Sequence, residues 1–243
     1  MTGARRRAVF FLLAAAAFAA ATAVFVARRR PEPLPARPAA ERPTLMLLTS
    51  LPLLFGEDFS LQGGSSPALK KLETRYRIIP ISVTDEADLK KGWLLLMAQP
   101  LAQTAENLVN LDAWVRGGGR VLLLADPMLE WPSERPFGDP LRPPPIFMDT
   151  GLLAHWGLVL DAPDQRGPAA RDLGGFRALT VSPGRLEGRC SVSADALLAH
   201  CRIGTGEATI VADADLLDVN RLGPKAQQNL DGLISELARL EQK

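Results

Sequence analysis

The stretch from residue 92 to residue 127 limits this chain to few folds, because it predicts a complete β-α-β unit. Two short apolar runs, Trp93 to Ala98 and Arg120 to Ala125, are bounded by Gly or Pro, a pattern typical of strands that are covered on both faces of a parallel sheet. Between them, apolar residues recur at helical spacing from Leu101 to Val115. Since a crossover between parallel strands is right-handed in nearly all proteins, this unit predicts an open α/β sheet with helices on both faces.

Further strands and helices are predicted on both sides of this unit. Strands are expected at residues 44–50, 77–83 and 207–212, and residues 178–203 have the composition of β structure. Helices are expected after Ser66, where Pro67 suits a first turn, and from Pro224 onward, where apolar residues form one stripe. The predicted class is therefore α/β, with an open, mostly parallel sheet.

Three segments and the final helix carry a resemblance to a known family. The segments are WLLLMAQP, LDAWVRGGGRVLLLADP and GTGEATIVADADLLD, and the helix opens after Asn220. Over roughly Leu45 to Leu240 they resemble the extracytoplasmic domain of the gliding-motility-type auxiliary component of ABC transporters. The resemblance implies a flavodoxin-like, class I glutamine-amidotransferase-like fold. It also implies a non-enzymatic, membrane-tethered accessory domain whose partner is an ABC transporter permease or another membrane subunit.

The beginning of the chain predicts a membrane anchor. Residues 8–27 carry no charge and are flanked by three arginines on each side. At 1.5 Å per residue, a helix of this length reaches about 30 Å, the thickness of a bilayer core. Residues 1–30 are therefore expected to be a single-pass anchor in the inner membrane, with the soluble domain facing the periplasm. The alternative is a cleaved signal peptide, for which Ala21-Thr22-Ala23 could supply the cleavage site.

Residues 31–43 contain five prolines, too many fixed φ angles for a helix or the interior of a sheet. They predict a stalk in polyproline form, followed by one α/β domain over residues 44–243. Charge argues against nucleic acid as a partner of that domain. Residues 1–42 hold eight Arg against two Glu, which leaves 20 basic and 25 acidic residues from Pro43 onward. A nucleic-acid-binding domain needs a basic face.

A long loop follows the second strand of the β-α-β unit. Seven prolines lie between Pro127 and Pro145, and a loop this long in a compact domain is usually functional or disordered. It leaves the carboxyl end of a strand, the edge at which open α/β sheets bind their ligands. Trp131, Arg135 and Phe137, residue types enriched at interface hot spots, stand together on it. We name residues 127–147 the flap and predict that these three side chains contact a partner.

The sequence offers no catalytic or cofactor-binding motif. Cys190 lies in a segment close to a nucleophile elbow, but the segment lacks the second glycine, and no G-x-S-x-G or G-x-x-x-x-G-K-[ST] occurs. The leading hypothesis is therefore a protein without catalytic residues or cofactors. The alternative is a periplasmic hydrolase or amidotransferase-like enzyme with an unrecognised site.

No metal site is predicted. Asp126, Asp213 and Asp215 follow the ends of predicted strands, where carboxylates could meet around a cation, although such residues more often cap turns and helices. His155 and His200 are isolated, with no metal-ligand spacing around either.

Two cysteines in an exported chain usually pair, so Cys190 and Cys201 are predicted to form a disulfide. A hairpin with its turn between Asp195 and Ala196 would place them opposite each other. A helix over residues 193–200 is the competing interpretation and could separate them.

Overall fold

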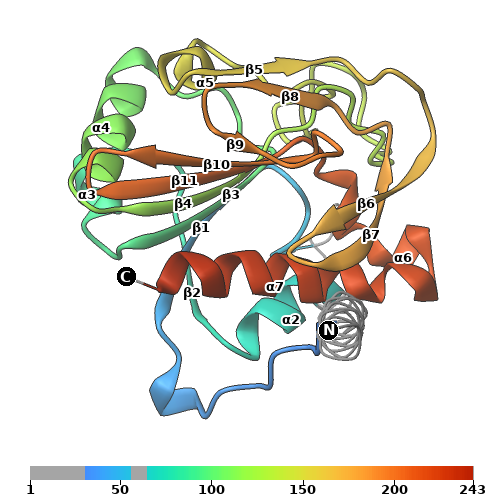
Figure 1. The fold of residues 1–243 in the computed structure, drawn as a ribbon, viewed down its shortest axis with the longest axis horizontal. Helices are drawn as coiled ribbons and strands as arrows, with labels where there is room; N and C mark the ends of the chain where they lie inside the picture. Colours follow the sequence, from blue (N-terminus) through green and yellow to red (C-terminus); the bar gives the residue numbers. More distant parts are fainter. Residues whose placement is uncertain (1–30, 56–64, 243) are drawn as a thin grey trace, which may run out of the picture. The chain divides into compact units, whose positions relative to one another are not determined.

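The computed structural model describes residues 31–55 and 65–242, and the chain from Pro33 onward forms one compact unit. At its centre is a seven-stranded sheet in the order β2-β1-β3-β4-β11-β10-β9 (Figure 1). The first five strands in this order are parallel, and β10 and β9 complete the sheet in antiparallel pairings. The strands are β1 (Thr44–Thr49), β2 (Arg77–Pro80), β3 (Leu94–Ala98), β4 (Arg120–Leu124), β9 (Ser191–Val192), β10 (Leu198–Ile203) and β11 (Gly206–Val211).

Helices cover both faces of the sheet. One face carries α2 (Pro67–Glu73), α6 (Val219–Leu222) and α7 (Gln227–Glu241), and the other carries α3 (Glu86–Leu89), α4 (Ala105–Arg116) and α5 (Leu152–His155). In Figure 1, α7 runs along one side of the sheet and α4 lies at the other. Short 3-10 turns are η1 (Ala39–Glu41), η2 (Asp215–Leu217) and η3 (Pro224–Ala226).

The strand β4 shows why the predicted strands are apolar throughout. Leu122 and Leu124 belong to the core beneath α7, whereas Val121 and Leu123 belong to the core beneath α4. Successive side chains of a strand point to opposite faces, and here both faces are covered by helices. The predicted β-α-β unit is confirmed, since β3 and β4 pair in parallel and α4 connects them.

The flavodoxin-like arrangement that the resemblance implied is wrong for the second half of the chain. A sheet of that kind is parallel, with helical crossovers between its strands. Between β4 and β11, however, the structure has two separate two-stranded sheets: β5 (Leu158–Asp161) with β8 (Arg185–Gly188), and β6 (Pro168–Leu173) with β7 (Phe176–Val181). The prolines of the flap leave no room for a crossover helix, and the tight turn at Gly204 forces β10 and β11 into an antiparallel pair.

The predicted transmembrane helix, residues 8–27, lies outside the described residues. Among residues 31–55 and 65–242, every helix is too short or too polar to cross a bilayer. Within these ranges the structure therefore shows no single-pass anchor, and it gives the predicted inner-membrane location no support.

Part of the predicted stalk contacts the domain instead of extending away from it. The backbone N–H of Arg37 donates to the carbonyl of Thr74 at 2.9 Å, and its guanidinium pairs with Glu241 at 2.7 Å. The same guanidinium lies 5.8 Å from the centre of the Tyr76 ring, and Arg75 donates to the carbonyl of Pro35. These contacts use the Arg37 and Arg75 side chains and backbone carbonyl groups, so the number of prolines in the segment did not indicate them.

Candidate functional site

Two neighbouring strands end in buried aspartates at the carboxyl edge of the sheet. Leu124 of β4 pairs with Val211 of β11, and each is followed two residues later by an aspartate, Asp126 and Asp213. Because the two strands are parallel, the aspartates arrive at the same edge, together with Asp215 at the start of η2. All three side chains are fully buried.

Each of these carboxylates accepts hydrogen bonds from backbone N–H groups. Asp126 accepts from Met128 and Ala214, both at 2.8 Å, and Asp213 accepts from Val181 at 2.9 Å and Leu216 at 2.7 Å. They therefore tie together the turns that follow β4, β7 and β11. In the described part of the chain, no group of three acidic, His or Cys side chains could hold a metal ion.

Asp215 has two partners from different parts of the chain. One oxygen accepts from the backbone N–H of Glu130 in the flap, and the other accepts from the guanidinium of Arg221, both at 2.7 Å. Asp215 thereby fixes the start of the flap to the turn after β11.

Burial raises the pKa of all three aspartates, because removal from water disfavours the charged form. It raises the pKa of Asp126 to about 7 against the opposing N–H groups of Ala214 and Met128, and the nearby charge of Asp215 adds to the increase. Burial also raises the pKa of Asp215 to about 6, and it holds the pKa of Asp213 well above its usual range. This edge of the sheet therefore changes its charge near neutral pH.

The carboxylate of Glu130 is held by a short chain of hydrogen bonds. The backbone N–H of Gly167 donates to the Ser182 hydroxyl oxygen at 2.8 Å, and that hydroxyl donates to Oε1 of Glu130 at 2.5 Å. Ser182 is fully buried and has a positive φ of 47°. A residue other than glycine is costly in this conformation and persists where its surroundings hold it. Here its backbone N–H donates to the carbonyl of Gly167 at 2.8 Å.

Glu130 borders a pocket at the surface. The pocket has a volume of about 580 Å³ and is lined by Met128, Glu130, Arg166 and Gly167. Within the described ranges, Oε2 of Glu130 makes no hydrogen bond, and the guanidinium of Arg166 has no hydrogen bond or ion pair. An anchored carboxylate and an unpaired cation therefore line the same pocket.

The structure places the three predicted contact residues in different surroundings. Trp131 is half-buried against the core beneath α7, and Arg135 pairs with Asp139 at 3.6 Å. Phe137 is 79% exposed, with the guanidinium carbon of Arg142 4.0 Å from its ring centre. Contact of these residues with a partner stays a prediction.

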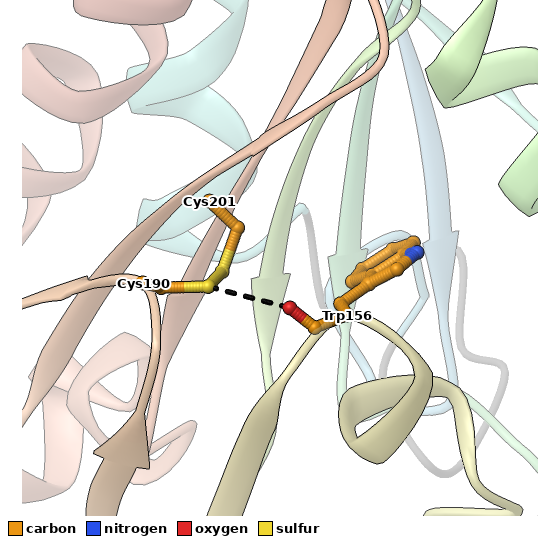
Figure 2. Close-up of a disulfide and its surroundings, with 3 residues drawn as sticks. All are labelled: Trp156, Cys190 and Cys201. Atoms are coloured by element: carbon orange, nitrogen blue, oxygen red, sulfur yellow. Dashed lines mark hydrogen bonds between the residues drawn. A yellow bond between two sulfur atoms is a disulfide. The ribbon is translucent and has the colours of Figure 1, made fainter.

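Cys190 and Cys201 form a disulfide, with Cα atoms 4.8 Å apart (Figure 2). They lie where a hairpin would place them, because Ser191 pairs with His200 in the antiparallel ladder of β9 and β10. The competing helix over residues 193–200 is absent. The dashed line in Figure 2 joins Sγ of Cys190 to the carbonyl oxygen of Trp156, 3.6 Å away; this is a contact, because a disulfide sulfur carries no proton.

The two histidines lie apart from the pocket, in ion-pair clusters of their own. His155 is 3.4 Å from Asp112, and His200 is 2.8 Å from Glu236, a residue of α7. Burial opposes ionisation of Glu236, yet its bonds with His200 and Arg239 hold its pKa below the usual value.

Sequence reasoning missed Glu130, Arg166, Gly167 and Ser182. Their meeting depends on the β6–β7 hairpin, which brings Gly167 and Ser182 to the flap from positions that no local pattern connects to Glu130. The available signal was the pair of aspartate-ended strands, which marked the correct edge of the sheet.

No family model matches the sequence, and a search of curated proteins gives no match. Solved structures with a related fold exist. The GH42 β-galactosidase Gan42B from G. stearothermophilus superposes with a TM-score of 0.50 and 12% identity, over 84% of this chain and 30% of that chain. Exo-β-1,4-mannosidase Op5Man5 from Opitutaceae bacterium strain TAV5 gives a TM-score of 0.47 and 14% identity, over 82% of this chain and 36% of that chain. The cytoplasmic protein STM3548 from Salmonella typhimurium gives a TM-score of 0.48 and 10% identity, over 81% of this chain and 98% of that chain.

These comparisons correct the assignment that the sequence suggested. Gan42B, which superposes with a TM-score of 0.50, is a glycoside hydrolase and not a glutamine-amidotransferase-like accessory domain of an ABC transporter, so that family and its fold class are wrong. Because a related fold occurs within an enzyme, the prediction of a non-enzymatic protein loses its basis as well. This chain spans about a third of the length of the two glycoside hydrolases, and the likeness shows fold alone.

Proposed function

We propose that this chain is a hydrolase and that the pocket beside Glu130 is its active site. The observation that carries the proposal is the state of the Glu130 carboxylate. One oxygen is fixed by the buried Ser182 hydroxyl at 2.5 Å, and the other is left for the pocket that Arg166 also lines. A positioned carboxylate can transfer protons, and a nearby guanidinium can stabilise a developing negative charge.

The reaction that suits this pair is the addition of water to an acyl carbon. Glu130 takes a proton from the water as its oxygen forms a bond to the carbonyl carbon, and the N–H groups of Arg166 bind the resulting oxyanion. The carbonyl then re-forms, the bond to the leaving oxygen breaks, and Glu130 returns its proton to that oxygen. The products are a carboxylic acid and an alcohol.

Cleavage of a glycoside suits the pocket less well, although glycoside hydrolases are among the solved structures with a related fold. That reaction normally requires two carboxylates on either side of the scissile bond. Among the described residues that line the pocket, Glu130 supplies the single carboxylate. Asp215 lies behind it, fully buried and bonded to Arg221, so it does not reach a substrate.

Hydrolysis of p-nitrophenyl acetate and of the p-nitrophenyl β-galactoside and β-mannoside tests the proposal. We expect turnover of the ester, a loss of about 10²- to 10⁴-fold in kcat/KM for Glu130→Gln, and a loss of about 10²- to 10³-fold for Arg166→Gln. Asp139→Asn, a carboxylate change in the flap outside the pocket, is the control and should retain the activity.

Two outcomes would overturn the proposal. An ester turnover that survives Glu130→Gln would remove this residue from catalysis. Turnover of a glycoside without turnover of the ester would remove the assigned reaction.

A further inference from the structure

A second pocket lies at the opposite edge of the sheet, beside the amino ends of β3, β4 and β11. Its volume is about 510 Å³, and it is lined by Trp93, Gly118, Arg120, Thr205, Leu240 and Glu241. Arg120 precedes Asp126 by six residues, so the two edges lie about 20 Å apart at roughly 3.3 Å per residue of strand. This pocket is therefore separate from the one beside Glu130.

An exposed tryptophan on a fixed backbone forms one wall of this second pocket. Trp93 is 43% exposed, and its carbonyl accepts the backbone N–H of Arg120 at 2.9 Å, directly before β3 begins. Leu240 of α7 lies beneath the pocket and is fully buried, so Trp93 supplies the apolar surface that a ligand can reach. The indole is thus available to a ligand, and the backbone that carries it is held by the sheet.

The charges around the pocket are balanced by one another. Arg120 is 3.3 Å from Glu207, and Glu241 is 2.7 Å from Arg37. An ionic ligand would have to compete with these pairs, whereas a neutral ligand would not.

The same groups nevertheless retain hydrogen-bonding capacity. In the described part of the chain, the guanidinium of Arg120 uses one of its donors, towards Glu207. The Thr205 hydroxyl donates to the carbonyl of Arg116 at 2.9 Å, and its oxygen can still accept. Glu241 accepts from Tyr76 at 2.5 Å and from Arg37 at 2.7 Å, and carboxylate oxygens have further lone pairs. Donors and acceptors therefore surround one aromatic face.

We propose that this pocket binds a neutral sugar ring stacked on Trp93. A pyranose carries C–H groups on one face, which pack against an indole, and hydroxyl groups at its rim, each of which both donates and accepts. Arg120 donates to these hydroxyls, and Glu241 and Thr205 accept from them. Aromatic walls with a few placed polar groups are the usual composition of small-ligand sites. The inference does not depend on the hydrolase assignment.

Calorimetric titration of the full chain with mannotetraose and with lactose tests this site. We expect binding of at least one saccharide, a loss of affinity of tenfold or more for Trp93→Ala, and partial retention for Trp93→Tyr, which keeps an aromatic face. Arg120→Gln should weaken binding as well. Phe137→Ala removes another exposed aromatic side chain, far from this pocket in sequence, and should bind as the unchanged chain does.

The outcome that overturns the proposal is failure of both saccharides to bind, or equal affinity in Trp93→Ala. Adenosine, a flat aromatic probe, serves as the competing ligand, and its tighter binding at Trp93 would also overturn it. The two sites are distinguished by crossed variants: Glu130→Gln should keep saccharide binding, and Trp93→Ala should keep ester hydrolysis.

Discussion

Asp215 accepts the backbone N–H of Glu130 at 2.7 Å across 85 positions of sequence, and this bond joins the flap to the turn after β11. Its other oxygen holds Arg221, so one buried carboxylate serves two segments. The position of the proposed catalytic carboxylate therefore depends on a residue that does not enter the pocket.

Replacement of Asp215 by alanine should destabilise the protein and disorder Glu130. We expect the free energy of unfolding to fall by about 2–4 kcal/mol, because a buried N–H and a guanidinium lose their partner. Urea unfolding measures the change. The matched control is Asp218→Ala, which removes the other carboxylate on Arg221 but leaves Glu130 in place. Its cost should be about 1 kcal/mol, the usual value of a helix cap. Equal costs for the two variants would contradict the assigned role.

The stability of the protein should fall as pH rises from about 4 to about 7. The folded-state pKa of Asp126 is about 7, against an ordinary value of 3.8, so the folded state binds more protons than the unfolded state within this window. Above about pH 7 the loss of stability from Asp126 is complete, and below about pH 4 there is no such loss. Asp215, with a pKa of about 6, acts in the same direction. The lowered pKa of Glu236 acts in the opposite direction, but only at more acidic pH.

Urea unfolding of the unchanged chain and of Asp126→Asn between pH 5 and pH 8 checks this sign. The variant should show a flatter dependence, because it lacks one of the titrating groups. A free energy of unfolding that rises between pH 5 and pH 7 would contradict the prediction.

Reduction of the disulfide should lower the free energy of unfolding by about 3 kcal/mol, the value expected for a loop closed over roughly a dozen residues. Cys190 and Cys201 are 11 positions apart. The double variant Cys190→Ser, Cys201→Ser should show a similar loss and should not respond to reductant, which makes it the control. Two titratable thiols in unreduced protein would show that the bond is not formed.

The sequence predicted elements that rest on local patterns, and it failed where distant segments meet. The β3 and β4 runs follow from residues close in sequence, and their bounds agree within a residue. The helix between them, α4, ends within a residue of the predicted pattern but begins at Ala105, four residues after Leu101. The final helix begins near Pro224, as expected, although its first turn is 3-10.

The candidate site is non-local by contrast. Its geometry depends on Ser182 adopting a positive φ beside Gly167. The residues around Ser182 form no local sequence pattern that predicts this conformation. The β6–β7 hairpin was missed as well, even though Gly174-Gly175 forms its turn. The resemblance to a transporter component failed because buried strands of Leu, Val and Ala are common to many α/β proteins.

The contact between Arg37 and Glu241 should make chains that begin at Pro33 more stable than chains that begin at Pro43. The longer chain retains an ion pair whose two side chains are 24% and 16% exposed, together with the backbone bond from Arg37 to Thr74. We expect a difference of about 1–2 kcal/mol in the free energy of unfolding. Arg37→Ala in the longer chain is the matched test of the side chain, and equal stability of all three proteins would show that the segment does not contribute.

Gly206 should tolerate no side chain, because a Cβ there would lie 1.9 Å from the carbonyl oxygen of Val115. Backbone atoms cannot move aside as a side chain can, so Gly206→Ala should cost about 3 kcal/mol or more, beyond the usual range of single substitutions. Gly117→Ala is the control: its Cβ would meet nothing nearer than 3.4 Å, and its φ of −78° suits alanine. Thermal unfolding should separate the two variants clearly, and a small effect at Gly206 would contradict the close approach.

The place of β11 in the sheet also governs the order in which the chain can fold. The strand that pairs with β4 begins at Gly206, more than 80 residues after β4 ends. During synthesis, therefore, β1 to β4 can assemble early, while the outer edge of β4 keeps its N–H and C=O groups unpaired until almost the whole domain has left the ribosome. An apolar, unpaired strand edge is a template for association with other chains. Nascent chains that end before Gly206 leave that edge unpaired, and only the last 38 of the 243 residues close it.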